Sequence, residues 1–113
     1  MKLLMNDQLN NSADKLIIAI KESLEYQQLM IVEEKINQNQ LLLKLITDIK
    51  SLQQKNLINP TLDGEQILNL KIDQLNQNKI YSEYLEALKN FNQLTKKINQ
   101  KINQYINNVI ELK

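Results

Sequence analysis

A chain of 113 residues with a formal net charge of +1 has room for one domain, and this charge balance excludes a strongly basic nucleic-acid-binding surface. Cysteine and histidine are both absent, which excludes disulfides, thiol nucleophiles, cysteine-ligated metals and histidine acid–base catalysis. One glycine and one proline leave few turns and almost no hairpin signals. The composition and the apolar patterns described below predict an all-α, single-domain helical bundle of about five helices with a long C-terminal helix.

The first part of the chain has little regular pattern at its start and then shows the signals of a short helix. Residues 1–11 show no regular apolar spacing, so we expect a poorly ordered N-terminus, with a single helical domain over residues 12–113. Ser12 is a suitable N-cap, and Leu16, Ile17, Ile20 and Leu24 beyond it share one helical face. These features predict a first helix over about residues 13–22.

Two further caps divide the next stretch. Ser23 is predicted to cap a second helix that reaches about Asn37, which places a bend between the first two helices. One continuous helix over residues 13–37 is the alternative. Asn39 is the natural N-cap of a third helix that ends near Asn56, and the wide apolar start of this helix predicts a central position in the bundle.

Residues 57–64 form the clearest connector in the chain. Pro60 pushes the residue before it out of helical conformation, and Gly64 offers an unusual backbone angle. Asp63 with Gln66 predicts a capping pair that opens a fourth helix. Because the connectors are short, we expect successive helices to pack mostly antiparallel.

The last third of the chain carries the strongest pattern. From Tyr84 onward, residues recur at alternating spacings of four and three, which is typical of a helix that packs nearly parallel to another helix. This seam consists of Tyr84, Leu88, Phe91, Thr95, Ile98, Ile102, Tyr105, Val109 and Leu112. A helix that starts at Asn78 or Ser82 and reaches the end of the seam is roughly 45 to 50 Å long, and it extends beyond its own bundle.

An apolar seam without cover is unstable in water, so the overhang predicts a homo-oligomer, a dimer or higher. The candidate residues for the oligomer interface or the core are Tyr84, Leu88, Phe91, Ile98, Ile102, Tyr105 and Val109. The sequence leaves open whether this seam faces the chain's own helices or a second copy.

The charged clusters predict no catalytic, cofactor or metal site. Four acids, Glu22, Glu25, Glu33 and Glu34, fit a solvated helix face, and three lysines, Lys96, Lys97 and Lys101, form a small basic patch that favours solubility. No phosphate loop, nucleophile elbow or metal motif occurs, so we expect no enzyme and no small-molecule substrate. Arginine is absent, which further disfavours nucleic-acid recognition. No long apolar run occurs, so we expect a cytoplasmic protein without membrane insertion.

Several short motifs follow one another in a distinctive order. They are residues 20–26 (IKESLEY), residues 33–36 (EEKI), a long polar–apolar helix, residues 81–87 (YSEYLEA), and the spaced apolar residues Leu94, Ile98, Ile102 and Ile106. Over about residues 12–110 this arrangement resembles the YlbF/YmcA/YheA family of small helical proteins from low-GC Gram-positive bacteria. The resemblance implies a non-enzymatic, self-associating helical bundle. For some members it implies a regulatory complex with sister proteins, linked to competence, sporulation, biofilm formation and messenger-RNA maturation.

The sequence departs from that family pattern at two points, and these limit which family features are expected in this chain. Members of the regulatory complex have C-terminal cysteines associated with iron–sulfur clusters, and this chain has none, so no cluster is expected. Asn78 and Lys79 stand where a proline often precedes the last helix. The resemblance therefore implies a YheA-like or divergent member.

Residues and resemblance together predict a cytoplasmic, oligomeric, non-enzymatic adaptor or regulator that acts through protein partners, which include paralogous family members. One alternative is a small helical secreted partner protein, although the Trp-x-Gly turn of such proteins is absent. A weak RNA-binding protein is the other alternative.

Overall fold

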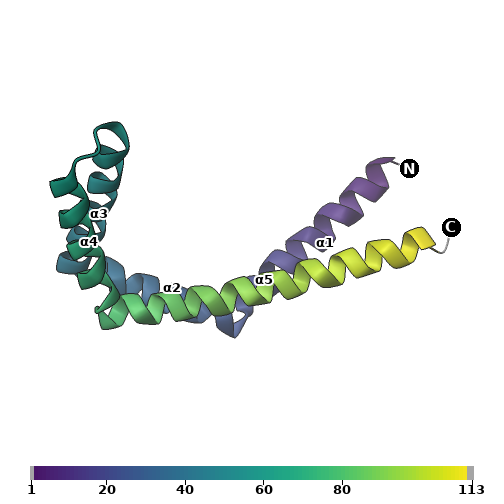
Figure 1. Ribbon diagram of the computed structural model, residues 1–113. Helices are drawn as coiled ribbons and strands as arrows, with labels where there is room; N and C mark the ends of the chain where they lie inside the picture. The colour runs from purple at the N-terminus through teal and green to yellow at the C-terminus, as the bar shows by residue number, and fades with distance from the viewer. Residues whose placement is uncertain (1, 112–113) are drawn as a thin grey trace.

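The computed structural model describes the backbone of residues 2–111 and the side chains of residues 7–110 (Figure 1). Its five helices are α1 (Lys2–Glu22), α2 (Leu24–Gln38), α3 (Gln40–Ile58), α4 (Leu62–Asn76) and α5 (Lys79–Glu111). No strand occurs within residues 2–111. The predicted all-α fold of five helices with a long C-terminal helix is confirmed.

Two single-residue breaks turn the chain, and each is built on a predicted cap. Ser23 is extended, with φ −66° and ψ 150°, and its hydroxyl accepts a hydrogen bond from the backbone N–H of Tyr26 at 3.2 Å. Asn39 ends α2 and caps α3, because its Oδ1 accepts from the N–H of Leu42 at 3.1 Å. The bend at Ser23 is confirmed, and the continuous helix over residues 13–37 is excluded.

We expect Asn39→Ala to lower the free energy of unfolding by about 1 kcal/mol, because the first turn of α3 loses its only side-chain acceptor for an otherwise free N–H. Asn39→Asp is the matched control, since a carboxylate accepts the same bond and also suits a helix N-terminus. Urea unfolding followed by circular dichroism measures both. Equal losses in the two variants would contradict the capping role.

The start of α1 differs from the prediction. This helix begins at Lys2 and not near residue 13, and Ser12 lies inside it and not at its cap. Residues 2–12 contain neither glycine nor proline, so the backbone offers no reason for the helix to stop there. The expected poor order of residues 1–11 is a separate property and stays a prediction.

The connection between α3 and α4 also corrects the sequence analysis. Pro60 takes Asn59 out of the helix, as predicted, with φ −141° and ψ 80°. Thr61 then caps α4, and its hydroxyl accepts from the N–H of Gly64 at 3.0 Å. The predicted capping by Asp63 and the unusual angle at Gly64 were wrong, because Thr61 is already extended and reaches a free N–H first.

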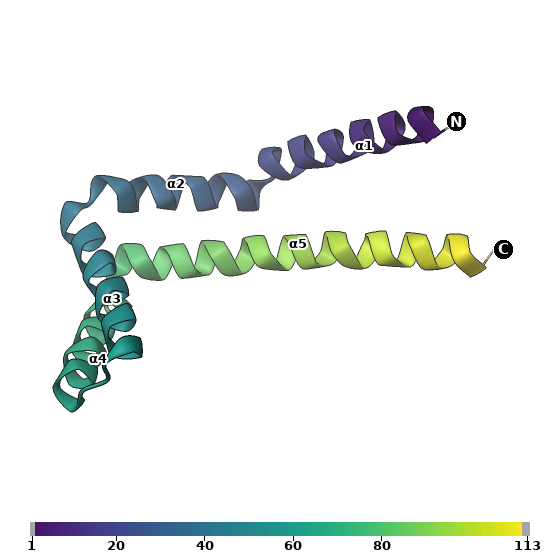
Figure 2. The same ribbon diagram turned by 90° about the horizontal axis from the view of Figure 1, so that it is seen from above.

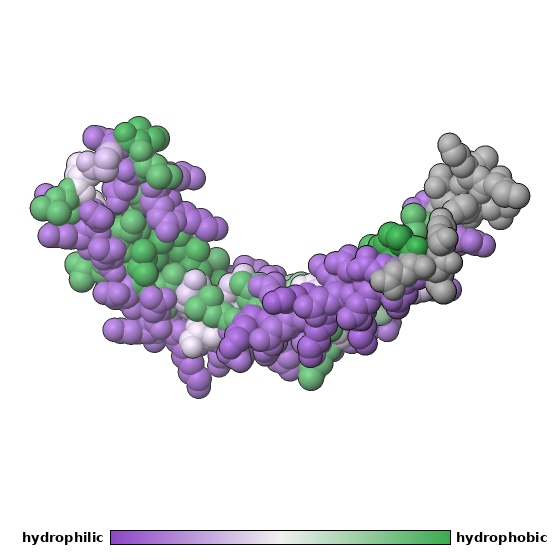
Figure 3. Space-filling model, turned by 45° about the vertical axis from the view of Figure 1, so that its right-hand side comes forward, coloured by the Kyte–Doolittle hydropathy of each residue, from purple (hydrophilic) through white to green (hydrophobic). Residues whose placement is uncertain are grey.

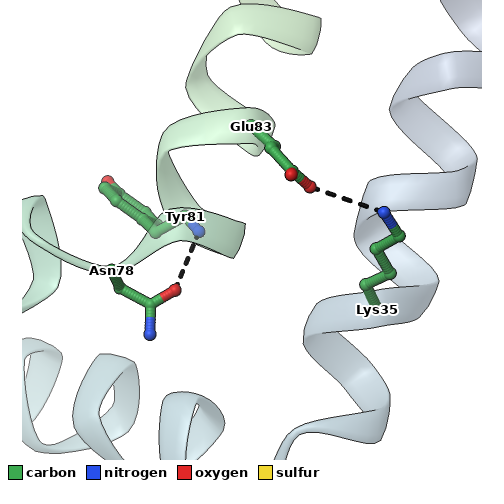
Figure 4. Close-up of polar contacts among 4 residues, drawn as sticks. All are labelled: Lys35, Asn78, Tyr81 and Glu83. Carbon is green, nitrogen blue, oxygen red and sulfur yellow. Dashed lines mark hydrogen bonds and ion pairs between the residues drawn. The ribbon is translucent and has the colours of Figure 1, made fainter.

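Asn78 opens the long helix α5. Its Oδ1 accepts a hydrogen bond from the N–H of Tyr81 at 3.1 Å (Figure 4). In the next turn of α5, Glu83 pairs with Lys35 of α2 at 3.5 Å (Figure 4). Both partners of this ion pair are more than a third exposed, so it orients α2 against α5 and adds little stability. Of the two predicted starts for α5, Asn78 is confirmed, and Ser82 lies inside the helix.

The helices form an open crescent. Helix α2 runs antiparallel to the first half of α5, and α3 and α4 form an antiparallel hairpin that projects from one end (Figures 1 and 2). The radius of gyration is 20.8 Å, against about 13 Å for a compact domain of this size. Among successive helices only α3 and α4 pack antiparallel. The expectation that successive helices pack mostly antiparallel was wrong, because the single-residue caps at Ser23 and Asn39 change the direction of the chain without reversing it.

The buried core lies where α2, α3, α4 and α5 meet. It consists of Leu29, Val32, Ile36, Leu42, Ile49, Leu75 and Ala87. Leu42, near the start of α3, is 2% exposed, which agrees with the central position predicted from the wide apolar start of this helix. No described side chain of α1 belongs to this core. The core therefore lies at one corner of the crescent. Helix α1 and the C-terminal half of α5 extend away from that corner (Figure 2).

Candidate protein-interaction surfaces

The apolar seam of α5 divides into two parts with different surroundings. In the first part, Tyr84, Leu88 and Phe91 are partly buried against the core. The ring of Phe91 lies 5.9 Å from the ring of Tyr26 in α2, measured between centroids. Ile98 is the last seam residue that is half-buried. This part of the predicted seam contacts the chain's own helices.

Beyond Ile98 the described seam residues are exposed to solvent. We call residues 99–110 of α5 the distal arm, and every side chain in it is exposed. Its apolar residues, with their exposed fractions, are Ile102 (41%), Tyr105 (71%), Ile106 (47%), Val109 (41%) and Ile110 (62%). Three predicted interface residues, Ile102, Tyr105 and Val109, therefore lie on a free surface. Their contact with a second copy stays a prediction.

A groove separates the distal arm from α1. Across residues 2–111, no Cα atom of α1 lies within 8 Å of a Cα atom of α5, and the two helices diverge toward their free ends (Figure 2). The groove has a volume of about 580 Å³ and is lined by Gln8, Leu9, Ser12, Ala13, Leu16, Ile102 and Tyr105. Its walls are mainly apolar, and a surface of this kind is typical of a protein contact site.

A second apolar surface lies on the hairpin of α3 and α4. We call Leu57, Ile58 and Leu62 the hairpin tip, and they are 84%, 87% and 71% exposed. The sequence pattern predicts this segment only as a connector. Three large aliphatic residues beside a proline are unusual for a connector, which is normally polar, and this was the signal that the prediction missed.

The titratable side chains of the described residues lie at or near the surface. No polar or charged residue is buried among them, whereas active sites usually bury groups with perturbed acidity. No group of three or more acids within this part of the chain is arranged to hold a metal ion. Across residues 2–111, every helix falls short of the length or apolar character needed to cross a membrane. The surfaces described above are suited to binding other apolar protein surfaces.

Comparison with known proteins gives one result that identifies the family. No curated protein and no solved structure matches the chain. The family described as "Control of competence regulator ComK, YlbF/YmcA" matches residues 9–107, which include the last two thirds of α1, all of α2, α3 and α4, and most of α5. The match confirms the resemblance drawn from the short motifs, and the chain belongs to the YlbF/YmcA family of competence regulators.

Proposed function

We propose that this protein is a cytoplasmic, non-enzymatic adaptor that acts as an oligomer and controls competence through contacts with protein partners. The family supplies the regulatory role. One observation supports the adaptor role: the apolar face of the distal arm continues in register with the packed half of α5 but is exposed to solvent. The proposal includes a cytoplasmic location because the family controls the regulator ComK, and we expect that control to take place inside the cell.

A second copy of the chain is the partner that best fits this exposed face. Exposed apolar surface on both sides of a groove lowers solubility unless another surface covers it. An identical chain is always present at equal concentration, and closed symmetric dimers are the commonest way to cover such a surface. Paralogous family members with a similar arm are further partners under this proposal. We assign no small-molecule substrate.

Deletion of the gene in a naturally competent host tests the regulatory role. We expect transformation frequency and ComK-dependent expression to fall, and the unmodified gene to restore both. The variant Ile102→Asp should fail to restore them although its protein level is normal, because the charge lies on the apolar face that the proposal assigns to the partner. Unchanged transformation in the deletion strain would contradict the proposed function.

A further inference from the structure

Helix α1 is joined to the rest of the molecule at a single residue. Ser23 is the only residue between α1 and α2, and its backbone lies in the broad extended region, where ψ varies over tens of degrees without a clash. Among the other helices, only α2 has Cα atoms within 8 Å of α1. Of the described side chains of α1, Leu16 and Ile20 are half-buried and the rest are exposed. A rotation at Ser23 therefore turns α1 as a rigid rod and disturbs little packing.

The contacts between α2 and α5 set a register that continues into α1. The ring of Tyr26 packs on the ring of Phe91, and Lys35 pairs with Glu83, so the two helices run in opposite directions with a fixed pairing of residues. We extended this pairing past Ser23, one residue for one residue to within a single position. It places α1 residues opposite successive members of the α5 seam: Ile20 with Ile98, Leu16 with Ile102, Ser12 with Tyr105, and Leu9 with Val109.

The one polar interruption of the seam fits the same register. Thr95 interrupts the aromatic and aliphatic residues of the seam, and the register places it opposite Ser23, where the chain bends. The seam therefore lacks a large apolar side chain at the level where α1 and α2 have none to pack on it. Two helices whose apolar residues recur at matching spacings of three and four pack side by side.

The two walls of the groove are compatible with direct contact. They include Leu9, Ser12 and Leu16 from α1 and Ile102 and Tyr105 from α5, and none of the residues that line the groove is charged. Closure of the groove therefore brings its walls together without burying a charge. Because α1 and α5 diverge toward their free ends, a turn of α1 toward α5 closes the groove from the end near Ser23 (Figure 2).

We propose that α1 is a hinged strap that turns at Ser23, closes on the distal arm of its own chain, and competes there with a second copy. The closed strap covers Ile102, Tyr105 and Val109, which are also the exposed residues assigned to the oligomer. Closure and assembly therefore exclude each other, and assembly requires the open strap. The regulatory consequence rests on the proposed oligomeric function, whereas the closure of α1 does not depend on it.

Closure covers less apolar surface than assembly can cover. The register pairs neither Ile106 nor Ile110 with a residue of α1, and both are exposed. The hairpin tip, at the other end of the molecule, also stays exposed, and Figure 3 shows hydrophobic atoms at the end of this projecting hairpin. A second copy that binds only the open state shifts the balance toward that state as its concentration rises. The strap therefore sets the concentration at which the oligomer forms.

Disulfide trapping tests the strap, since the chain has no native cysteine. Leu9→Cys with Val109→Cys places two small apolar thiols at exposed positions that the register pairs. In the structure their Cα atoms are more than 8 Å apart, and a disulfide spans about 7 Å at most, so the bond forms only when α1 closes. We expect mild oxidation of dilute protein to give an intrachain disulfide, seen as a single chain of faster mobility in non-reducing electrophoresis. Light scattering at tens of micromolar should then give the mass of one chain for the oxidised protein and at least twice that mass after reduction.

Asn10→Cys with Val109→Cys is the matched control, because Asn10 is the next residue of the same helix and does not line the groove. Circular dichroism verifies that both variants keep their helix content. An equal disulfide yield in the control, no disulfide in either variant, or a covalent dimer in place of the intrachain bond would overturn the closure. A locked strap that keeps the mass of the oligomer would overturn the competition. The mass of the unmodified protein separates the two proposals: a monomer refutes the oligomeric function, and the disulfide yield still decides whether α1 closes.

Discussion

Ile102→Asp is expected to convert the oligomer into a monomer without loss of helix content. The substitution places a charge on the apolar wall of the groove, on the face that the proposal assigns to a second copy. Burying an unpaired charge at an interface costs about 3 kcal/mol, which raises the dissociation constant roughly a hundredfold. Light scattering at tens of micromolar protein measures the change in mass.

Asn103→Asp is the control for that experiment. It adds the same side chain to the next residue of the same helix, on the face away from the groove, so helix propensity and net charge change almost equally. We expect this variant to keep the mass of the unmodified protein. If both variants dissociate alike, charge on α5 as a whole governs assembly, and the apolar seam does not.

Leu42→Ala is expected to lower the free energy of unfolding by about 2 to 5 kcal/mol, because the leucine is buried and its truncation leaves a cavity in the core. The total stability of a domain of this size is about 5 to 15 kcal/mol, so this is a large fraction of it. Urea unfolding at one fixed protein concentration measures the loss, since assembly also adds to apparent stability.

The neighbouring Leu41 provides the matched control, because it is 83% exposed and carries the same side chain. We expect Leu41→Ala to change stability by no more than about 0.5 kcal/mol. Similar losses in the two variants would mean that the core does not lie at the corner of α2, α3, α4 and α5.

The local features of the fold were predictable because they depend on short stretches of sequence. Ser23, Asn39 and Asn78 each accept a hydrogen bond from a backbone N–H three residues later, and this capping pattern is visible in the sequence. The cap of α4 was misassigned because Thr61 and Asp63 are both acceptable capping residues. The choice between them depends on the backbone after Pro60, which the side-chain types alone do not specify.

The directions of the helices were not predictable in the same way. Apolar periodicity shows which face of a helix needs cover, but it does not show what covers that face. Helix α5 keeps one repeat throughout, yet its first half packs on α2 and its distal arm is exposed. For this reason the seven predicted seam residues fall into a packed group and an exposed group. Tyr84, Leu88 and Phe91 serve the chain's own packing, and only the exposed members remain candidates for a partner.

The surface on the hairpin tip shows a further limit of the sequence analysis. Leu57, Ile58 and Leu62 have no periodic relation to one another, since they lie on both sides of a turn. They form one cluster only after α3 and α4 pack antiparallel. Contacts between residues that are far apart along the chain determine this surface, and single-sequence patterns do not report such contacts.

The mass of the unmodified protein in solution tests most directly the central claim that the crescent needs a second copy to cover its apolar ends. Multi-angle light scattering on a size-exclusion column, at tens of micromolar protein, measures it without any substitution or label. The account predicts a mass of at least twice the 13.3 kDa of the single chain. A single species at the mass of one chain across this concentration range would contradict it.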